Sequence, residues 1–178
     1  MAEPSFVSSI PPLTPARDLP VRLRDRSDLA KYLVHAHQPV LSVRHGQSST
    51  IDGVLVAGTR PGEWLLLGNR MEALRLAESA ADIATRVDFT HGRALLSIEG
   101  LQAANALAKL CDLDLSDYMT PDGAVASGYV AGVVCDLIRR DEEGEPAYLL
   151  LFDRSYGPYM SSVLETAMAE FISDVGAP

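Results

Sequence analysis

The stretch Val87–Asp114, VDFTHGRALLSIEGLQAANALAKLCDLD, decides the fold of this chain. Apolar residues alternate over residues 94–98, which is typical of a strand with one face more buried than the other. Gly100 ends the extended run, and apolar residues then recur at spacings of three and four over Leu101–Cys111, as on one face of a helix. A strand that passes directly into a helix packs that helix on its own sheet. We therefore predict that this stretch is the centre of a sheet.

The chain that follows repeats this pattern of strands and then a helix. Residues 126–140 are predicted to form one long strand or a hairpin, and residues 147–152 a returning strand. Ser155 is predicted to cap a final helix, because apolar residues recur at three and four over residues 156–172. This last helix has the longest apolar stripe in the chain.

The N-terminal half is predicted to be rich in strands, at residues 39–45, 51–59 and 63–68. Ser27 and Asn69 are each predicted to cap a helix. Several connections between strands are too short for parallel crossovers. The sequence therefore predicts an α+β fold with antiparallel or mixed sheets, helices packed on one face, and units close to split βαβ motifs.

The domain organisation follows from length and from proline content. Five of the eleven prolines fall within the first 20 residues, and each removes a backbone donor. Residues 1–25 are therefore predicted to be an extended, proline-rich arm. Residues 26–178 are predicted to form a single α+β domain, or two small sub-domains that share a core with a boundary near residue 85.

Charge and cysteine usage limit the class of protein. The net charge of -9 argues against a nucleic-acid binder and against an anionic membrane surface. No apolar segment is long enough to span a membrane, and we expect no secretory signal. Cys111 and Cys135 lie in apolar runs and are predicted to be buried free thiols, which favours a cytoplasmic location.

Sequence motifs offer little direct chemistry. Phosphate-binding and dinucleotide-binding glycine patterns, zinc-protease motifs and hydrolase motifs are not found in the sequence. His35 and His37 are two residues apart, a spacing that does not place side chains together on a helix, so no metal site is predicted. No catalytic residue is predicted on this basis.

Three residues are candidates for a binding pocket. Asp88 and His91 flank a turn, where they form either an Asp–His pair or a turn in which the aspartate bonds the backbone. Asp136 lies inside the apolar run VVCDLI. It faces solvent, pairs with a cation such as Arg93, or belongs to a site.

The second half of the chain resembles the gamma subunit of heterotetrameric sarcosine oxidase. The resemblance is carried by VDFTHGRALLSIEG with AANALAKLCDLDL, by GEWLLLG upstream, and by FDRSYGPYMSSVLETA downstream. It covers roughly residues 60–172, and its three motifs occur in the family's order.

The gamma subunit is in turn related to the aminomethyltransferase (T-protein) of glycine cleavage. Residues 88–91, DFTH, resemble that family's D-SH turn, and residues 131–138, AGVVCDLI, resemble its GG-DDLI segment. Cys135 stands where the family has the first acid of the pair, so only Asp136 remains. The resemblance thus makes Asp88, His91 and Asp136 candidates for a folate pocket, and the missing acid favours a subunit that keeps the fold while a partner keeps the activity.

The resemblance implies a function through partners. Such complexes oxidise an N-methyl amine such as sarcosine, pass the one-carbon unit to tetrahydrofolate or release formaldehyde, and produce hydrogen peroxide. FAD, FMN, NAD and tetrahydrofolate are expected on the larger, flavin-containing subunits, and no cofactor is expected on this chain. The predicted function is a non-catalytic gamma-type subunit, and the alternative is a freestanding tetrahydrofolate-binding demethylase or aminomethyltransferase-like protein.

Overall fold

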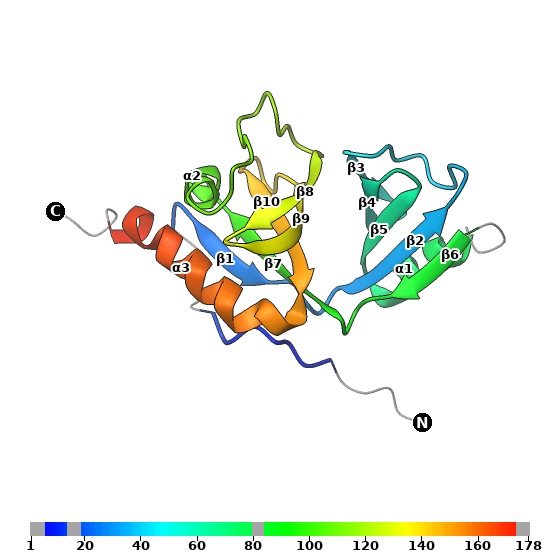
Figure 1. Cartoon of the computed structure of the whole chain (residues 1–178), viewed down its shortest axis with the longest axis horizontal. Coiled ribbons are helices and arrows are strands. Elements are labelled where there is room, and N and C mark those ends of the chain that lie inside the picture. The colour runs from blue at the N-terminus through cyan, green and yellow to red at the C-terminus, as the bar shows by residue number, and fades with distance from the viewer. Residues whose placement is uncertain (1–5, 14–18, 80–83, 174–178) are drawn as a thin grey trace.

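The computed structural model describes residues 6–13, 19–79 and 84–173, which form two antiparallel sheets of five strands each (Figure 1). Sheet A has the order β1–β7–β10–β9–β8, with β1 at Arg22–Asp25, β7 at Arg93–Glu99, β8 at Val125–Val130, β9 at Val133–Arg139 and β10 at Ala147–Asp153. Sheet B has the order β3–β4–β5–β2–β6, with β2 at Ala30–Ala36, β3 at Ser48–Ile51, β4 at Val54–Arg60, β5 at Glu63–Gly68 and β6 at Ala84–Asp88. Sheet B is therefore inserted between the first two strands of sheet A.

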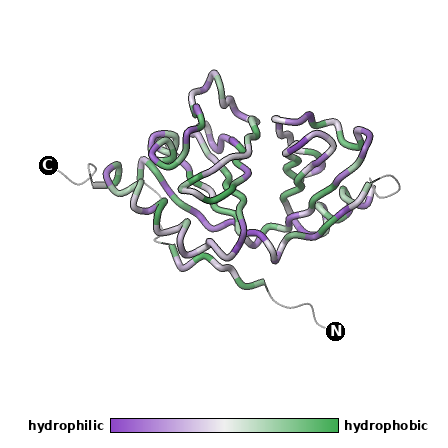
Figure 2. Tube along the Cα trace, viewed as in Figure 1, coloured by the Kyte–Doolittle hydropathy of each residue, from purple (hydrophilic) through white to green (hydrophobic). Residues whose placement is uncertain are grey.

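The sheets pack face to face, and helices cover their outer faces. Between the sheets lies an apolar core from both of them, made of Ala57, Leu65, Leu67, Leu95, Val125, Ile138, Leu149 and Leu151. Helix α1 (Arg70–Ser79) packs on sheet B, and α2 (Ala103–Ala108) and α3 (Gly157–Ser173) pack on sheet A. A short 3-10 helix, Arg154–Tyr156, joins β10 to α3. The predicted α+β fold with helices on one face is confirmed for each sheet, and Figure 2 shows hydrophobic residues along the strands of both.

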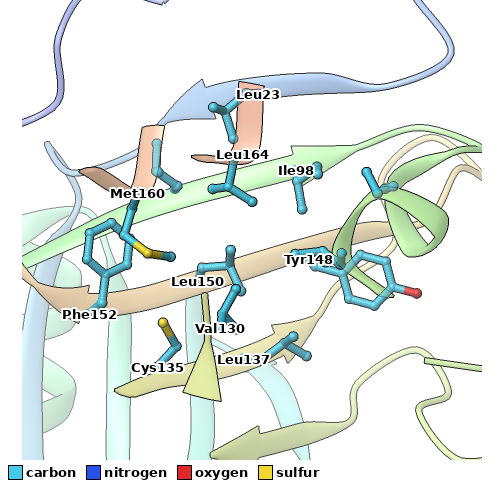
Figure 3. Close-up of a cluster of buried hydrophobic side chains, with 14 of the residues drawn as sticks. Leu23, Ile98, Val130, Cys135, Leu137, Tyr148, Leu150, Phe152, Met160 and Leu164 are labelled. Carbon is cyan, nitrogen blue, oxygen red and sulfur yellow. The ribbon is translucent and has the colours of Figure 1, made fainter. Parts of the chain in front are cut away.

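Sheet A and helix α3 enclose a large apolar core (Figure 3). Ile98 of β7, Leu150 of β10 and Leu137 of β9 are buried on the sheet face that the helix covers. Met160 and Leu164 of α3 are completely buried against them. Each such side chain contributes about 1.5–3 kcal/mol through burial, so this layer holds α3 on the sheet.

For the stretch Val87–Asp114, the predicted order of elements is confirmed, but its predicted place at the centre of a sheet is wrong. It forms strand, turn, strand and helix, as β6, β7 and α2. However, β10 is the centre of sheet A, β7 lies between β10 and β1, and β6 belongs to sheet B. The helix is also shorter than predicted: Gly100 has a φ of 109°, and Leu101 precedes α2 and is 69% exposed.

The helix predicted after Ser27 is wrong, because this segment is strand β2. Its apolar residues fit either period, but Ala30, Tyr32, Val34 and Ala36 face the same core at every second position. Strand β2 pairs with β5 on one side and with β6 on the other. This pairing on both edges stabilises the segment as a strand, and the local sequence pattern does not reveal it.

The strand predicted at residues 39–45 is also wrong. This segment is a loop. Among the described residues, it pairs with a strand only through a single bridge between His45 and Gly58. The indole Nε1 of Trp64 donates a hydrogen bond to the Val43 carbonyl at 2.7 Å. The loop is thus held by a side chain and a close backbone contact instead of a ladder of hydrogen bonds.

Other local predictions are confirmed. Strand β5 covers residues 63–68 as predicted, and residues 126–140 take the hairpin alternative, with a turn at Ala131 and Gly132 between β8 and β9. The Asn69 side chain accepts a hydrogen bond from the Met71 backbone at 3.0 Å at the start of α1. Ser155 does not directly precede the last helix, because it lies in the 3-10 helix before α3, where its backbone N–H donates a hydrogen bond to Asp153, the cap of that 3-10 helix.

The described part of the N-terminal arm lies against sheet A and α3. Ile10 is buried in the core under α3, and the Val7 carbonyl accepts a hydrogen bond from Arg154 at 3.2 Å. The backbone of Ser9 lies so close to Gly157 that a Cβ there would be 2.7 Å from the Ser9 carbonyl oxygen. The last residues of the predicted arm, Arg22–Asp25, form β1 and pair with β7.

Lys31 is a buried cation at the start of β2. Its ammonium Nζ donates to the carbonyl oxygens of Ser27 at 2.7 Å and Leu29 at 2.8 Å. Burial lowers the pKa of Lys31 from 10.5 to about 8, although Asp28 and other carboxylates oppose the shift. Between pH 8 and pH 10.5 the unfolded chain therefore keeps a proton that the folded chain has released.

We expect this difference to make the folded state gain stability with rising pH through that window. In Lys31→Met the contribution disappears, so the free energy of unfolding of the native chain should rise relative to that of the variant from pH 8 to pH 10.5. Urea denaturation of both proteins across this range measures the slope. Parallel pH profiles would contradict the lowered pKa, whatever the constant offset between the two proteins.

Candidate functional site

The candidate site is a small pocket between the two sheets, at the edge of their shared core. It has a volume of about 180 Å³. Sheet B and its β4–β5 turn contribute Leu33, Thr59, Arg60, Glu63 and Leu65, and the other wall is made of Phe89, Arg93, Asp136 and Leu151. Strand periodicity explains why polar groups meet there, because each lies two residues from a core residue on the same sheet face. Glu63, Arg93 and Asp136 precede Leu65, Leu95 and Ile138 in this way.

Asp136 is the central acid of this pocket. It lies on β9 opposite Ser127 of β8 and Leu151 of β10, and only 8% of the residue is exposed. The Ser127 hydroxyl donates a hydrogen bond to its Oδ1 at 2.6 Å. The carboxyl group is thus held in place inside an otherwise apolar strand, facing sheet B.

The opposite wall carries an ion pair from the turn between β4 and β5. Glu63 Oε1 accepts hydrogen bonds from Arg60 Nη1 at 2.6 Å and from the Thr59 hydroxyl at 2.7 Å. Burial acts to raise the pKa of Glu63, but the hydrogen bonds from Thr59 and Arg60 outweigh it and hold this pKa below its usual value. Glu63 is therefore an anion at neutral pH whose charge Arg60 balances.

Arg93 lines the same pocket from the start of β7. Its guanidinium carbon lies 6.0 Å from the centre of the Phe89 ring, at the limit of a cation–π contact. No ion pair forms between Arg93 and Asp136, both of which are among the described residues. Of the three interpretations of Asp136, solvent exposure and the ion pair with Arg93 are wrong, and its place in a binding site stays a prediction.

The other two candidate residues lie outside the pocket. Asp88 Oδ1 accepts a hydrogen bond from the Thr90 backbone at 2.8 Å, so the turn interpretation of Asp88 holds. Its Oδ2 lies 3.5 Å from Arg70. The His91 ring instead contacts Phe6, with 5.7 Å between ring centres. Asp88, His91 and Asp136 are therefore not brought together.

Cys135, the neighbour of Asp136, points to the opposite face of sheet A. It is buried in the core under α3, and burial raises the pKa of its thiol to about 12. The thiol therefore stays protonated at neutral pH and is a poor nucleophile. Cys135 and Cys111 are both free.

Sequence reasoning missed Thr59, Arg60 and Glu63. The sequence does carry a signal for them, because the charged residues Arg60 and Glu63 flank a turn between two apolar strands. Over the described ranges 6–13, 19–79 and 84–173, no group of three or more His, Cys, Asp or Glu side chains is placed to hold a metal ion. In the same ranges, no helix has the length and apolar character needed to cross a membrane.

Comparison with known proteins identifies the fold. A chain of heterotetrameric sarcosine oxidase from Corynebacterium sp. U-96, solved with pyrrole 2-carboxylate, superposes with a TM-score of 0.74 at 21% sequence identity. The match covers 88% of this chain and 87% of that one. The fold is aminomethyltransferase-like. This follows because the glycine cleavage system aminomethyltransferase T from Bartonella henselae also superposes, with a TM-score of 0.65 at 14% identity.

The aminomethyltransferase-like fold is shared with these proteins over different fractions of their length. The match to the Bartonella transferase covers 83% of this chain but only 46% of that protein. Neither a protein-family model nor a curated protein sequence matches the chain. The predicted resemblance is thus confirmed at the level of the fold.

Proposed function

We propose that this chain is a non-catalytic, gamma-type subunit of a heterotetrameric sarcosine oxidase-like complex. In this proposal the complex oxidatively demethylates an N-methyl amine and transfers the one-carbon unit to tetrahydrofolate. The observation that carries the proposal is the extent of the structural match. It spans nearly the whole of one chain from a sarcosine oxidase, at 87%, but less than half of an aminomethyltransferase, at 46%.

The inter-sheet pocket supports a role without chemistry on this chain. Its volume of about 180 Å³ lies below the roughly 300–1,000 Å³ of sites for drug-sized ligands. Arg60 and Glu63 neutralise each other, and Asp136 has its hydrogen bond from Ser127. General acid–base catalysis needs a positioned group next to a bound substrate, and this pocket has room for only a few atoms.

The partners in this proposal are the larger subunits of the same complex. FAD, FMN, NAD and tetrahydrofolate would belong to those subunits, and this chain would carry no cofactor. The complex would act in the cytoplasm, without nucleic acid or membrane. Purification of the native protein from its source, followed by identification of the chains that elute with it, tests this arrangement directly.

The second candidate function is a freestanding tetrahydrofolate-binding protein. The position of Asp136 favours it, because a buried carboxyl group in a pocket with Arg93 and Phe89 offers hydrogen bonding and a flat apolar contact to one end of the ligand, the rest of which would lie outside this small pocket. Titration of the isolated chain with tetrahydrofolate separates the two proposals. Saturable binding that Asp136→Asn abolishes would favour the folate-binding protein.

We expect Asp136→Asn to leave turnover of the assembled complex almost unchanged. The substitution keeps the shape and removes the charge, whereas loss of a general acid or base typically lowers a rate by about 10²–10⁴-fold. The measurement is amine-dependent peroxide production and one-carbon transfer after reconstitution with the partner subunits. The exposed Asp112→Asn serves as a matched control.

The outcome of that experiment decides between the proposals. Normal assembly with either rate reduced a hundredfold or more would move the function to a folate site on this chain, since about 10²-fold is the effect expected for a catalytic acid. Rates that fall only in step with lost assembly would support the subunit.

A further inference from the structure

We propose that a second pocket, on the outer side of the β4–β5 turn, binds a small organic anion with a flat apolar part. The pocket has a volume of about 450 Å³ and is lined by the loop at residues 37–45, by the turn at residues 60–62 and by Trp64. It is distinct from the pocket of Asp136, and Arg60 is the residue that lines both. The inference does not depend on the proposed function.

The walls of this pocket are fixed by two close approaches of backbone to backbone. A Cβ on Gly58 would lie 2.3 Å from the carbonyl oxygen of Arg44. A Cβ on Gly62, whose φ is +75°, would lie 2.5 Å from the carbonyl oxygen of Ala36. With the hydrogen bond from Trp64 Nε1 to the Val43 carbonyl at 2.7 Å, these contacts hold the loop on sheet B. A preformed wall lowers the ordering cost of binding a ligand.

The permanently charged side chains that line this pocket are arginines. Arg44 and Arg60 line it, and no carboxylate is found among its described lining residues, although Arg60 also pairs with Glu63 in the neighbouring pocket. This contrasts with the whole chain, whose net charge is -9. Within the described parts of the chain, Arg44 is exposed and makes no ion pair. A cationic concave surface on an acidic protein concentrates anions locally.

Most of the remaining lining residues are apolar, and the polar ones among them are His37, Gln38, Ser42 and His45. Trp64, Pro61, Pro39 and Leu41 contribute rings and an aliphatic side chain beside the arginines. The volume lies within the roughly 300–1,000 Å³ of small-molecule sites, where a mainly apolar lining is combined with a few placed polar groups. Arginine binds carboxylate and phosphate groups in a two-pronged geometry. The ligand class is therefore an aromatic or heteroaromatic carboxylate or phosphate.

Trp64 gives this proposal a direct readout, because it is the only tryptophan in the chain. Its single indole N–H resonance in an NMR spectrum reports on the pocket through the hydrogen bond to Val43. Titration with benzoate is expected to shift this resonance saturably with a Kd of about 1 mM or tighter. Benzyl alcohol, which has a similar shape and no charge, is expected to bind at least about tenfold more weakly.

Substitutions test whether the arginines supply the anion contact. Arg44→Gln is expected to weaken benzoate binding by about tenfold, since it removes a charge-assisted hydrogen bond. Arg60→Gln is expected to weaken it by a smaller factor, because Arg60 also pairs with Glu63. Arg75→Gln, on the exposed face of α1 and outside the pocket, is the matched control and should bind as the native chain does. Circular dichroism of each variant establishes that it is folded before the titration.

Three outcomes would overturn the inference. The first is an indole resonance that does not shift with benzoate in the folded native chain. The second is benzoate binding that Arg44→Gln and Arg60→Gln leave unchanged. The third is saturation by a glutamate-rich peptide but not by benzoate, which would make the pocket a contact for an acidic protein segment.

Discussion

Replacement of Leu164 by alanine is expected to lower the free energy of unfolding by about 2–5 kcal/mol. Leu164 is completely buried between α3 and sheet A, among side chains such as Leu150 and Ile98 (Figure 3). The loss combines the transfer of the removed carbons with a cavity that the surrounding strands fill only in part. Urea denaturation of the native chain and the variant at one pH measures the difference.

Leu101→Ala makes the same chemical change where the side chain is 69% exposed. It should cost under about 0.5 kcal/mol, as substitutions on the surface usually do. Equal losses at the two positions, or a loss below about 0.5 kcal/mol for Leu164→Ala, would contradict the packing of α3 on sheet A. A loss of about 2–5 kcal/mol for Leu164→Ala would confirm that α3 stabilises the fold through this face.

The second large effect is expected at Gly58. In Gly58→Ala the new methyl group would lie 2.3 Å from the Arg44 carbonyl oxygen, so the loop at residues 37–45 must move away from β4. Overpacking of this kind typically costs about 1–3 kcal/mol. Loss of the hydrogen bond between Trp64 and Val43 would add about 0.5–1.5 kcal/mol.

Gly128→Ala on β8 is the matched control, because the nearest atom to a Cβ there is 3.8 Å away. We expect Gly58→Ala to lower the urea midpoint clearly and to shift the indole N–H resonance of Trp64, and Gly128→Ala to do neither. An unchanged indole resonance in Gly58→Ala would show that the loop accommodates the methyl group without moving.

The parts of the fold that could be predicted are those where local pattern and final burial agree. Strand β5 and helix α3 have apolar patterns that suit one structure only, and their bounds were close to the prediction. Strand β2 was predicted as a helix because Leu29, Tyr32 and Leu33 also fit a helical spacing. Its two neighbouring strands are distant in sequence, and a local pattern carries no information about them.

The same limit applies to the candidate site. Asp136 stood out in the sequence because an acid inside an apolar run needs a partner or a site. Its actual partner, Ser127, lies across a hairpin whose register the sequence left open. Glu63 and Arg60 come from the other sheet, so their place opposite Asp136 depends on how the two sheets pack. Grouping Asp88 and His91 with Asp136 relied on resemblance, and the structure separates them.

The insertion of sheet B into sheet A has a consequence for the order of folding during synthesis. Sheet B is built from the continuous residues 30–88, so all its strands are synthesised before β7. Strand β1, in contrast, is synthesised first and pairs with β7, with Leu23 opposite Ile98. Closing such a long loop delays that pairing. Until β7 appears, β1 is an unpaired edge, and its arginines and aspartate reduce the risk of aggregation at this stage.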